Sequence, residues 1–273
     1  MKPTKKTLSK AALYLFMTAL ALVFLAPLAY AIFTSLVPFE YVNKFPPLSV
    51  LSFDNYKKLF EQYPMFTWYK NTIAVTFYTL VLTISTSLTA GYALAKLNFR
   101  GKKLIFNGIL TTLMVPFQLL ITPLYIMVAT LGWHNDIKGL VIPFAVSSLS
   151  VFMARQFYLT IPDELIEAAR VDGMGYIRSF FKIVLPLSGP LVATLAIFNF
   201  TSCWNAYLVP STFLAKTDKF TLAVGLNTIK AANFIRPNET MAGVILLSLP
   251  VLVMFFFLQK WFIQGIASSG LKE

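Results

Sequence analysis

Long apolar runs separated by short charged segments make up the pattern of this chain. Each run holds about 20 mainly apolar residues, the length that an α-helix needs to cross a bilayer core of about 30 Å. No linker or low-complexity stretch separates the runs, so residues 1–273 are expected to form one all-α, polytopic membrane domain. Six transmembrane helices are predicted, approximately over residues 11–37, 71–95, 104–131, 139–157, 184–209 and 241–262.

The basic residues between the runs indicate which side of the membrane each connection faces. Lysine and arginine are concentrated before the first run and again at residues 96–103, and cytoplasmic loops carry this kind of excess. Both termini and the polar segment 155–183 are therefore expected in the cytoplasm. The stretches 38–70 and 210–240 are expected outside.

The first apolar run also has a feature of a cleaved leader. Ala29-Tyr30-Ala31 has the A-x-A form of a signal-peptidase site and follows a basic start. The run continues past Ala31 and exceeds the roughly 7–15 residues usual for a leader, so a retained helix is favoured over cleavage.

Composition supports a membrane setting and excludes several soluble functions. The residues are 57% hydrophobic and only 12% charged, and so much apolar surface cannot be hidden in one water-soluble core. The net charge of +12 is spread between the apolar runs, which argues against a nucleic-acid partner. Cys203 and His134 are the only cysteine and histidine, so neither a metal site nor a catalytic triad is expected.

Two absences bear on any energy-driven activity. All eleven acidic residues fall outside the predicted spans, whereas ion-coupled carriers use ionisable groups at membrane depth. A secondary (ion-coupled) transporter is therefore disfavoured; it remains an alternative, as does a membrane-embedded enzyme, although no catalytic residue is assigned. The chain also has no G-x-x-x-x-G-K-[ST] phosphate loop, so ATP hydrolysis is expected only in a partner.

Residues 160–183 are the most informative polar stretch. Thr160 and Asp163 have capping-box spacing, and Pro162 between them suits a helix start. Gly173 can end that helix in a left-handed conformation. One side of the helix should carry Leu165, Ile166 and Ala169, and a second amphipathic helix should follow with Ile177, Phe180, Phe181 and Val184 on one face.

Periodicity alone would also allow an interfacial helix resting on the lipid surface. The residues themselves are more specific, because Glu167-Ala168-Ala169, then Gly173, then Ile183-Val184-Leu185-Pro186 resemble the EAA signature of binding-protein-dependent ABC importer permeases. The resemblance covers the whole chain and is to sugar-importer permeases related to the smaller permease of the maltose system. Met174 and Glu273 are small departures from that family's pattern.

The resemblance implies a type I ABC importer-like fold in a prokaryotic cytoplasmic (inner) membrane. It also implies several partners: a second homologous permease that completes the pore, two ATPase subunits that bind ATP and Mg, and an extracytoplasmic solute-binding protein that delivers a sugar. No cofactor or metal is expected in this chain. By resemblance, the residues that couple to the ATPase are Glu167, Ala168, Ala169, Asp172, Gly173, Leu185 and Pro186. Residues 160–183 are therefore called the coupling segment below.

Polar side chains inside the predicted spans are candidates for lining a pore or contacting substrate, because such groups prefer the protein interior or a watery cavity. Hydrogen bonding between helices is the alternative for each of them. Trp204 and Tyr207 can stack on sugar rings or lie in an interfacial aromatic belt, and the belt is favoured for Tyr207. The main candidates are Gln118, Asn199, Trp204 and Asn205, and the lesser ones are Ser147, Ser148, Ser202 and Ser248. Helix kinks are expected at Pro116, Pro123, Pro143 and Pro250.

Overall fold

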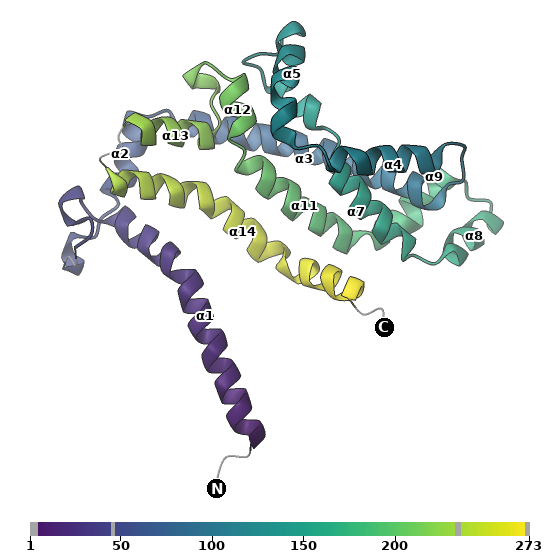
Figure 1. The fold of residues 1–273 in the computed structure, drawn as a ribbon, viewed down its shortest axis with the longest axis horizontal. Coiled ribbons are helices and arrows are strands. Elements are labelled where there is room, and N and C mark those ends of the chain that lie inside the picture. The colour runs from purple at the N-terminus through teal and green to yellow at the C-terminus, as the bar shows by residue number, and fades with distance from the viewer. Residues whose placement is uncertain (1–4, 45–46, 233–235, 271–273) are drawn as a thin grey trace. The chain divides into compact units, whose positions relative to one another are not determined.

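The computed structural model describes residues 5–44, 47–232 and 236–270. Within these ranges the regular structure is helical and no strand is assigned, which confirms the predicted all-α class (Figure 1). The chain divides into two compact units. The first unit consists of Met1–Met65 and Leu226–Leu249, and the second of Phe66–Gly225 and Pro250–Glu273.

The first unit begins with the predicted first span. Helix α1 covers Lys5–Leu36, and its part from Ala12 to Leu36 is long and apolar enough to cross a membrane. Two short 3-10 turns and one amphipathic helix follow it. They are η1 (Phe39–Tyr41), η2 (Leu48–Val50) and α2 (Asp54–Gln62).

A buried amide pair joins three segments of the first unit. The Nδ2 of Asn55 donates to the carbonyls of Ser35, at 2.9 Å, and Val37, at 2.8 Å, while its Oδ1 accepts from Nδ2 of Asn238 at 2.8 Å. Both asparagines are 2% exposed. Because the last carbonyls of a helix have no partner within it, Asn55 satisfies the end of α1 and holds α2 against it.

The last predicted span is longer than expected, and this overturns one sequence-based conclusion. Helix α14 covers Pro237–Gly270, so it begins four residues before the predicted start and places Glu239 in its first turn. The statement that no acidic residue lies in a span is therefore wrong for Glu239. Its side chain is 2% exposed and pairs with Arg236 at 2.9 Å. A negative charge suits this position because a helix N-terminus is partly positive.

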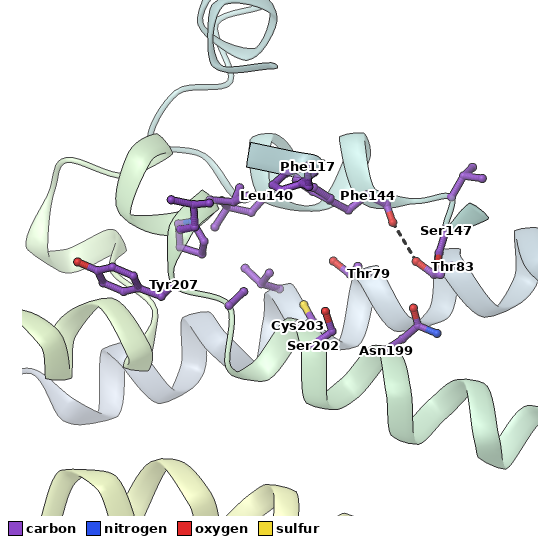
Figure 2. A pocket seen from close by; sticks show the side chains of 16 residues that line it. Thr79, Thr83, Phe117, Leu140, Phe144, Ser147, Asn199, Ser202, Cys203 and Tyr207 are labelled. Carbon is purple, nitrogen blue, oxygen red and sulfur yellow. Dashed lines mark hydrogen bonds between the residues drawn. The ribbon is translucent and has the colours of Figure 1, made fainter. Parts of the chain in front are cut away.

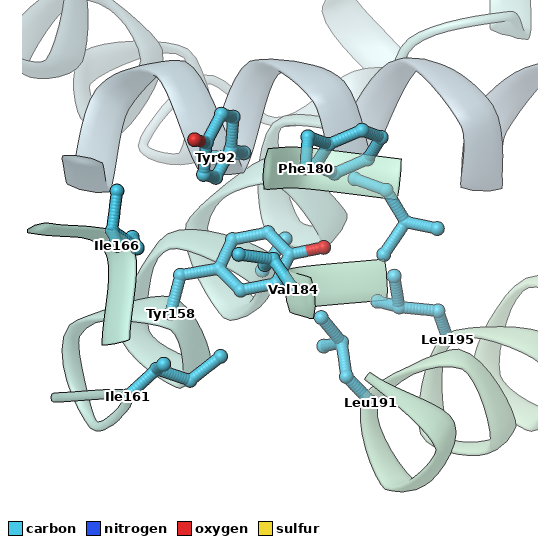
Figure 3. Packing of buried hydrophobic residues seen from close by; sticks show 10 residues of the cluster. Tyr92, Tyr158, Ile161, Ile166, Phe180, Val184, Leu191 and Leu195 are labelled. Carbon is cyan, nitrogen blue, oxygen red and sulfur yellow. The ribbon is translucent and has the colours of Figure 1, made fainter. Parts of the chain in front are cut away.

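The second unit is built on α3 (Met65–Lys96), which covers the second predicted span and begins six residues earlier. Helices α7 (Ser148–Leu159) and α11 (Gly189–Trp204) pack with it around one apolar cluster. Figure 3 shows Tyr92, Tyr158 and Phe180 meeting in this cluster.

Gly91 permits the close approach of α3 and α7 in this unit. A Cβ added to it would lie 2.5 Å from the Cβ of Ala154, closer than real Cβ atoms come. The two backbones meet at this point, so any larger side chain would push them apart.

The predicted third span, 104–131, is not a single helix. It consists of α4 (Lys102–Leu113) and α5 (Phe117–Thr130), which are bent by 103° relative to each other. The bend lies at Pro116, as predicted, and it has a local cause: proline lacks a backbone N–H donor and disfavours helical geometry in the residue before it. Pro123 and Pro250, by contrast, lie inside the helices α5 and α14, and neither helix is broken there.

The predicted fourth span contains a 3-10 turn, and the predicted fifth span is bent. The fourth, 139–157, falls on α6 (Ile137–Val141), the turn η3 (Ile142–Phe144), which contains Pro143, and α7. The fifth, 184–209, begins earlier and bends by 76° between two apolar stretches, Tyr176–Leu187 and Gly189–Trp204.

Within the described residues, four helical stretches are long and apolar enough to cross a membrane, namely Ala12–Leu36, Met65–Lys96, Ile137–Leu159 and Pro237–Lys260. Counting each bent pair as one further span gives up to six. The exact number of six thus stays a prediction. The remaining elements are α8 (Asp163–Val171), α9 (Tyr176–Ser179), the π-helical turn η4 (Phe180–Val184), α10 (Leu185–Leu187), α12 (Leu208–Phe213), η5 (Thr217–Lys219) and α13 (Leu222–Ala232).

Candidate functional site

The coupling segment contains the predicted helix, α8, at one end of the second unit (Figure 1). The predicted capping box is wrong. The hydroxyl of Thr160 donates to the carbonyl of Phe157 at 2.7 Å, so it completes the end of α7 and does not cap α8. Helix α8 instead begins directly after Pro162, with no side-chain cap.

Helix α8 buries a narrower face than the sequence predicts. Ile166 and Ala169 are 6% and 3% exposed, but Leu165 is 43% exposed. Ala169 therefore packs inside this chain. Glu167 and Ala168 lie on the outer side and are exposed.

Gly173 ends α8 as predicted. Its φ of +79° is left-handed, and its N–H and that of Met174 donate to the carbonyls of Arg170 and Ala169 at 3.0 and 2.9 Å. No atom lies within 4 Å of a Cβ built on Gly173. The backbone conformation, and not a shortage of space, is thus what favours glycine. Asp172, just before it, is exposed.

The returning helix matches its predicted pattern only in part. Phe180 and Val184 are buried, whereas Ile177 and Phe181 are 76% and 58% exposed. The turn from Phe180 to Val184 is π-helical, and its wider turn breaks the 3.6-residue period on which the prediction rested. Of the two residues predicted to complete the signature, Leu185 packs partly against the apolar cluster and Pro186 is exposed.

A cavity of about 450 Å³ lies within the second unit, between α3, α11 and the break before α7 (Figure 2). Its wall is mainly apolar, with a few polar groups. Such a composition is usual for sites that bind small molecules. The polar lining residues are Thr79, Thr83, Ser147, Asn199, Ser202, Cys203 and Tyr207.

The structure separates the predicted pore residues into two groups. Asn199, with Ser147 and Ser202, lines the cavity, whereas Gln118, Trp204 and Asn205 do not. Gln118 and Asn205 are exposed elsewhere on the chain.

Trp204 is 3% exposed and stacks on Phe200 with ring centroids 5.3 Å apart, so it offers no free face to a sugar. The alternative of bonding within or between helices holds for two lesser candidates. Ser148 accepts from Thr112 at 2.7 Å, and Ser248 donates to the carbonyl of Val244 at 2.8 Å.

Two features of the cavity wall were missed from the sequence. Thr79 and Thr83 bring hydroxyls from α3, and Thr83 donates to the carbonyl of Phe144 at 2.9 Å. Thr79 is 8% exposed, faces the Cys203 thiol, and has no nitrogen or oxygen partner among the described residues. The available signal was a series of threonines at helical spacing, Thr72, Thr76, Thr79 and Thr83.

Comparison with known proteins defines the class of this chain. Residues 87–268 match the family described as binding-protein-dependent transport system inner membrane component. A solved bacterial ABC transporter involved in importing the acidic polysaccharide alginate has the same fold, with a TM-score of 0.81, 23% identity, and coverage of 96% of this chain and 99% of that one.

Two curated relatives resemble the chain along almost its whole length. The arabinooligosaccharides transport system permease protein AraQ of Bacillus subtilis is 33% identical over 96% of this chain and 95% of its own. The maltodextrin transport system permease protein MalD of Streptococcus pneumoniae is 33% identical over 97% and 96%. The chain therefore belongs to the family of inner-membrane components of binding-protein-dependent transport systems.

Proposed function

We propose that this chain is the permease subunit of an ATP-driven importer of sugars or oligosaccharides. In this proposal it forms the translocation pore together with a second, homologous permease. The observation that carries the proposal is α8, a short helix at one end of the second unit with its apolar side packed inside and its acidic side exposed. The names of the relatives support the choice of cargo.

Helix α8 is suited to dock into a groove of an ATPase subunit, as amphipathic helices do in other complexes. Glu167 is proposed as its polar contact, and the small side chain of Ala168 permits close approach. ATP and Mg would be held by two such ATPase subunits, while this chain provides the docking helix and the path. Docking and transport then share one rigid-body movement.

The cavity is proposed as part of the path taken by the sugar. Sugar hydroxyls need both donors and acceptors, and the hydroxyls of Thr79 and Ser202 can act as either. Asn199 holds its amide toward Ser150 Oγ, at 3.0 Å, and the carbonyl of Leu195, at 2.7 Å, which fixes its orientation in the wall. An extracytoplasmic binding protein would deliver the sugar to this path.

Purification and reconstitution test the proposal directly. The chain purified in mild detergent should bring with it an ATPase and a second permease. In proteoliposomes with the binding protein outside and ATP inside, arabinooligosaccharide or maltodextrin should accumulate. Accumulation driven by a proton gradient in the absence of ATP would overturn the proposal and support the secondary-transporter alternative.

Cys203 provides a separate test of the cavity, because it is the only cysteine and lines the wall. A small methanethiosulfonate reagent should modify it in the assembled complex, and transported sugar should slow the reaction. Unchanged labelling in the presence of a sugar that the complex does transport would place the path elsewhere.

A further inference from the structure

The C-terminal end of α3 contacts the coupling segment on both sides of α8. Lys96 Nζ donates to the carbonyl of Ile161 at 2.6 Å and to Asp163 Oδ1 at 2.5 Å, where α8 begins. One turn earlier, the hydroxyl of Tyr92 donates to the carbonyl of Tyr176 at 3.2 Å, where the chain returns after Gly173. Residues four apart lie on one face of a helix, so a single face of α3 makes both contacts.

Other cations satisfy the carbonyl groups at the end of α3. Lys102 Nζ donates to the carbonyls of Leu97, at 2.8 Å, and Ala95, at 3.1 Å, and Arg155 Nε donates to that of Leu94 at 3.2 Å. Cations are favoured there because a helix C-terminus is partly negative. The ammonium group of the last α3 residue is thus available for a contact outside its own helix.

The contact made by Lys96 is buried at one end and solvated at the other. The Lys96 side chain is 4% exposed and that of Asp163 is 76% exposed. Ile161, whose carbonyl is the buried acceptor, is 7% exposed and belongs to the apolar cluster. A buried ammonium without partners is costly, so its position and that of the Ile161 carbonyl are fixed together.

We propose that the C-terminal end of α3 holds the coupling segment in position through hydrogen bonds. Lys96 is the positioning residue that fixes where α8 begins. Movement of α8 then reaches α3 through Lys96 and Tyr92, and α3 carries it to the cavity wall at Thr79 and Thr83. This inference rests on the proposed function, because it assigns a role within the same coupling process. It adds a residue that the EAA resemblance does not contain.

The first test compares three variants in the complete reconstituted transporter. Lys96→Met removes the charge and donors while keeping a long side chain, and Lys96→Arg keeps them. Lys103→Met removes an exposed cation from the same connection. With Lys96→Met, we expect transport and binding-protein-stimulated ATP hydrolysis to fall by on the order of 5- to 150-fold, the usual range of coupling between sites. Basal hydrolysis and the amount of bound ATPase should stay unchanged.

Lys96→Arg should restore most of the loss, and Lys103→Met should behave as wild type. Wild-type coupling in Lys96→Met would overturn the inference. So would an equal loss in Lys103→Met, since that would indicate a general effect of positive charge.

The second test measures how firmly α8 is held against α3, and it does not depend on the sugar. Spin labels at Val171→Cys on α8 and Thr89→Cys on α3, in a Cys203→Ser background, report the distance between the two helices in the assembled complex. Lys96→Met should broaden the distance distribution, and Lys103→Met should not. A distribution that Lys96→Met leaves unchanged would overturn the inference. Absence of stimulated hydrolysis in the wild-type complex would instead contradict the proposed function. The label distances would still show whether Lys96 holds α8 in position.

Discussion

At the scale of single residues, Glu167 is the side chain whose charge matters most for the proposed docking. It is exposed on α8, and reversing its charge would place repulsion where the proposal has attraction. We expect Glu167→Lys to lower transport by on the order of 5- to 150-fold, with normal abundance of the chain in the membrane. Uptake in proteoliposomes and an immunoblot of the membrane fraction measure the two quantities.

Glu164→Lys is the matched control, since Glu164 is also an exposed acid of α8 but lies outside the EAA signature. It should retain most of the transport. Equal losses in the two variants would show that the overall charge of α8, and not the contact of Glu167, is responsible.

Gly173 and Gly175 offer a comparison that isolates backbone conformation. Both have open space around an added Cβ, but Gly173 has a φ of +79° and Gly175 a φ of −73°. Gly173→Val should therefore destabilise the local turn by about 1–3 kcal/mol, whereas Gly175→Val should have little effect. Limited proteolysis of the coupling segment measures the difference, and similar cleavage rates in both variants would contradict the explanation.

At the scale of elements, the sequence predicts helices better than their breaks. A run of apolar residues is sufficient to identify α3, because length and hydropathy are properties of the run itself. Pro116 indicates where the third span bends but not that the bend reaches 103°. The π-helical turn at Phe180–Val184 has no such local signal, and Phe181 within it and Ile177 before it both lie outside the buried face.

The candidate site shows the same division between local and distant causes. Gly173 is predictable because a left-handed helix end is a property of one position. The role of Lys96 cannot be predicted from the sequence, because its partner carbonyl belongs to a residue 65 positions away. The sequence shows only that Lys96 is one of several basic residues in a short connection. The cavity could not be predicted from the sequence either, because Asn199 comes near Thr79 and Thr83 only when α11 packs beside α3.

The buried amide of Asn55 leads to a prediction about the first unit. Asn55→Ala removes the donor to the carbonyls of Ser35 and Val37, and it leaves Nδ2 of Asn238 with only the longer contact to the Val37 carbonyl, at 3.4 Å. Buried polar groups that lose their partners cost roughly 1–3 kcal/mol, so the variant should unfold at a lower temperature.

Asn71→Ala is the control for Asn55→Ala. Asn71 also donates to two carbonyls, those of Asp218 and Phe220, both at 2.9 Å, but it is only half-buried. Water can replace part of what this variant loses, so its unfolding temperature should fall less. Thermal unfolding of the purified complex followed by circular dichroism measures both, and a larger fall for Asn71→Ala would contradict the role given to burial.

At the scale of the whole molecule, the two bent pairs determine the topology. With the N-terminus inside, six spans place residue 135 outside and residue 170 inside. If both bent pairs instead entered and left the membrane on one side, only four spans would remain, with residue 135 inside and residue 170 outside. Residue 225 lies outside in both arrangements, so it does not distinguish them.

The charges favour six spans. The coupling segment with its flanks carries Arg155, Arg170, Arg178 and Lys182, while the connection 132–138 carries only Lys138. Because basic residues stay on the cytoplasmic side, we expect reporter fusions at residue 170 to show the activity of a cytoplasmic reporter. Fusions at residues 135 and 225 should show alkaline-phosphatase activity, which requires export. Phosphatase activity at residue 170 without activity at residue 135 would establish four spans, place α8 on the side away from ATP, and exclude it as the contact of an ATPase.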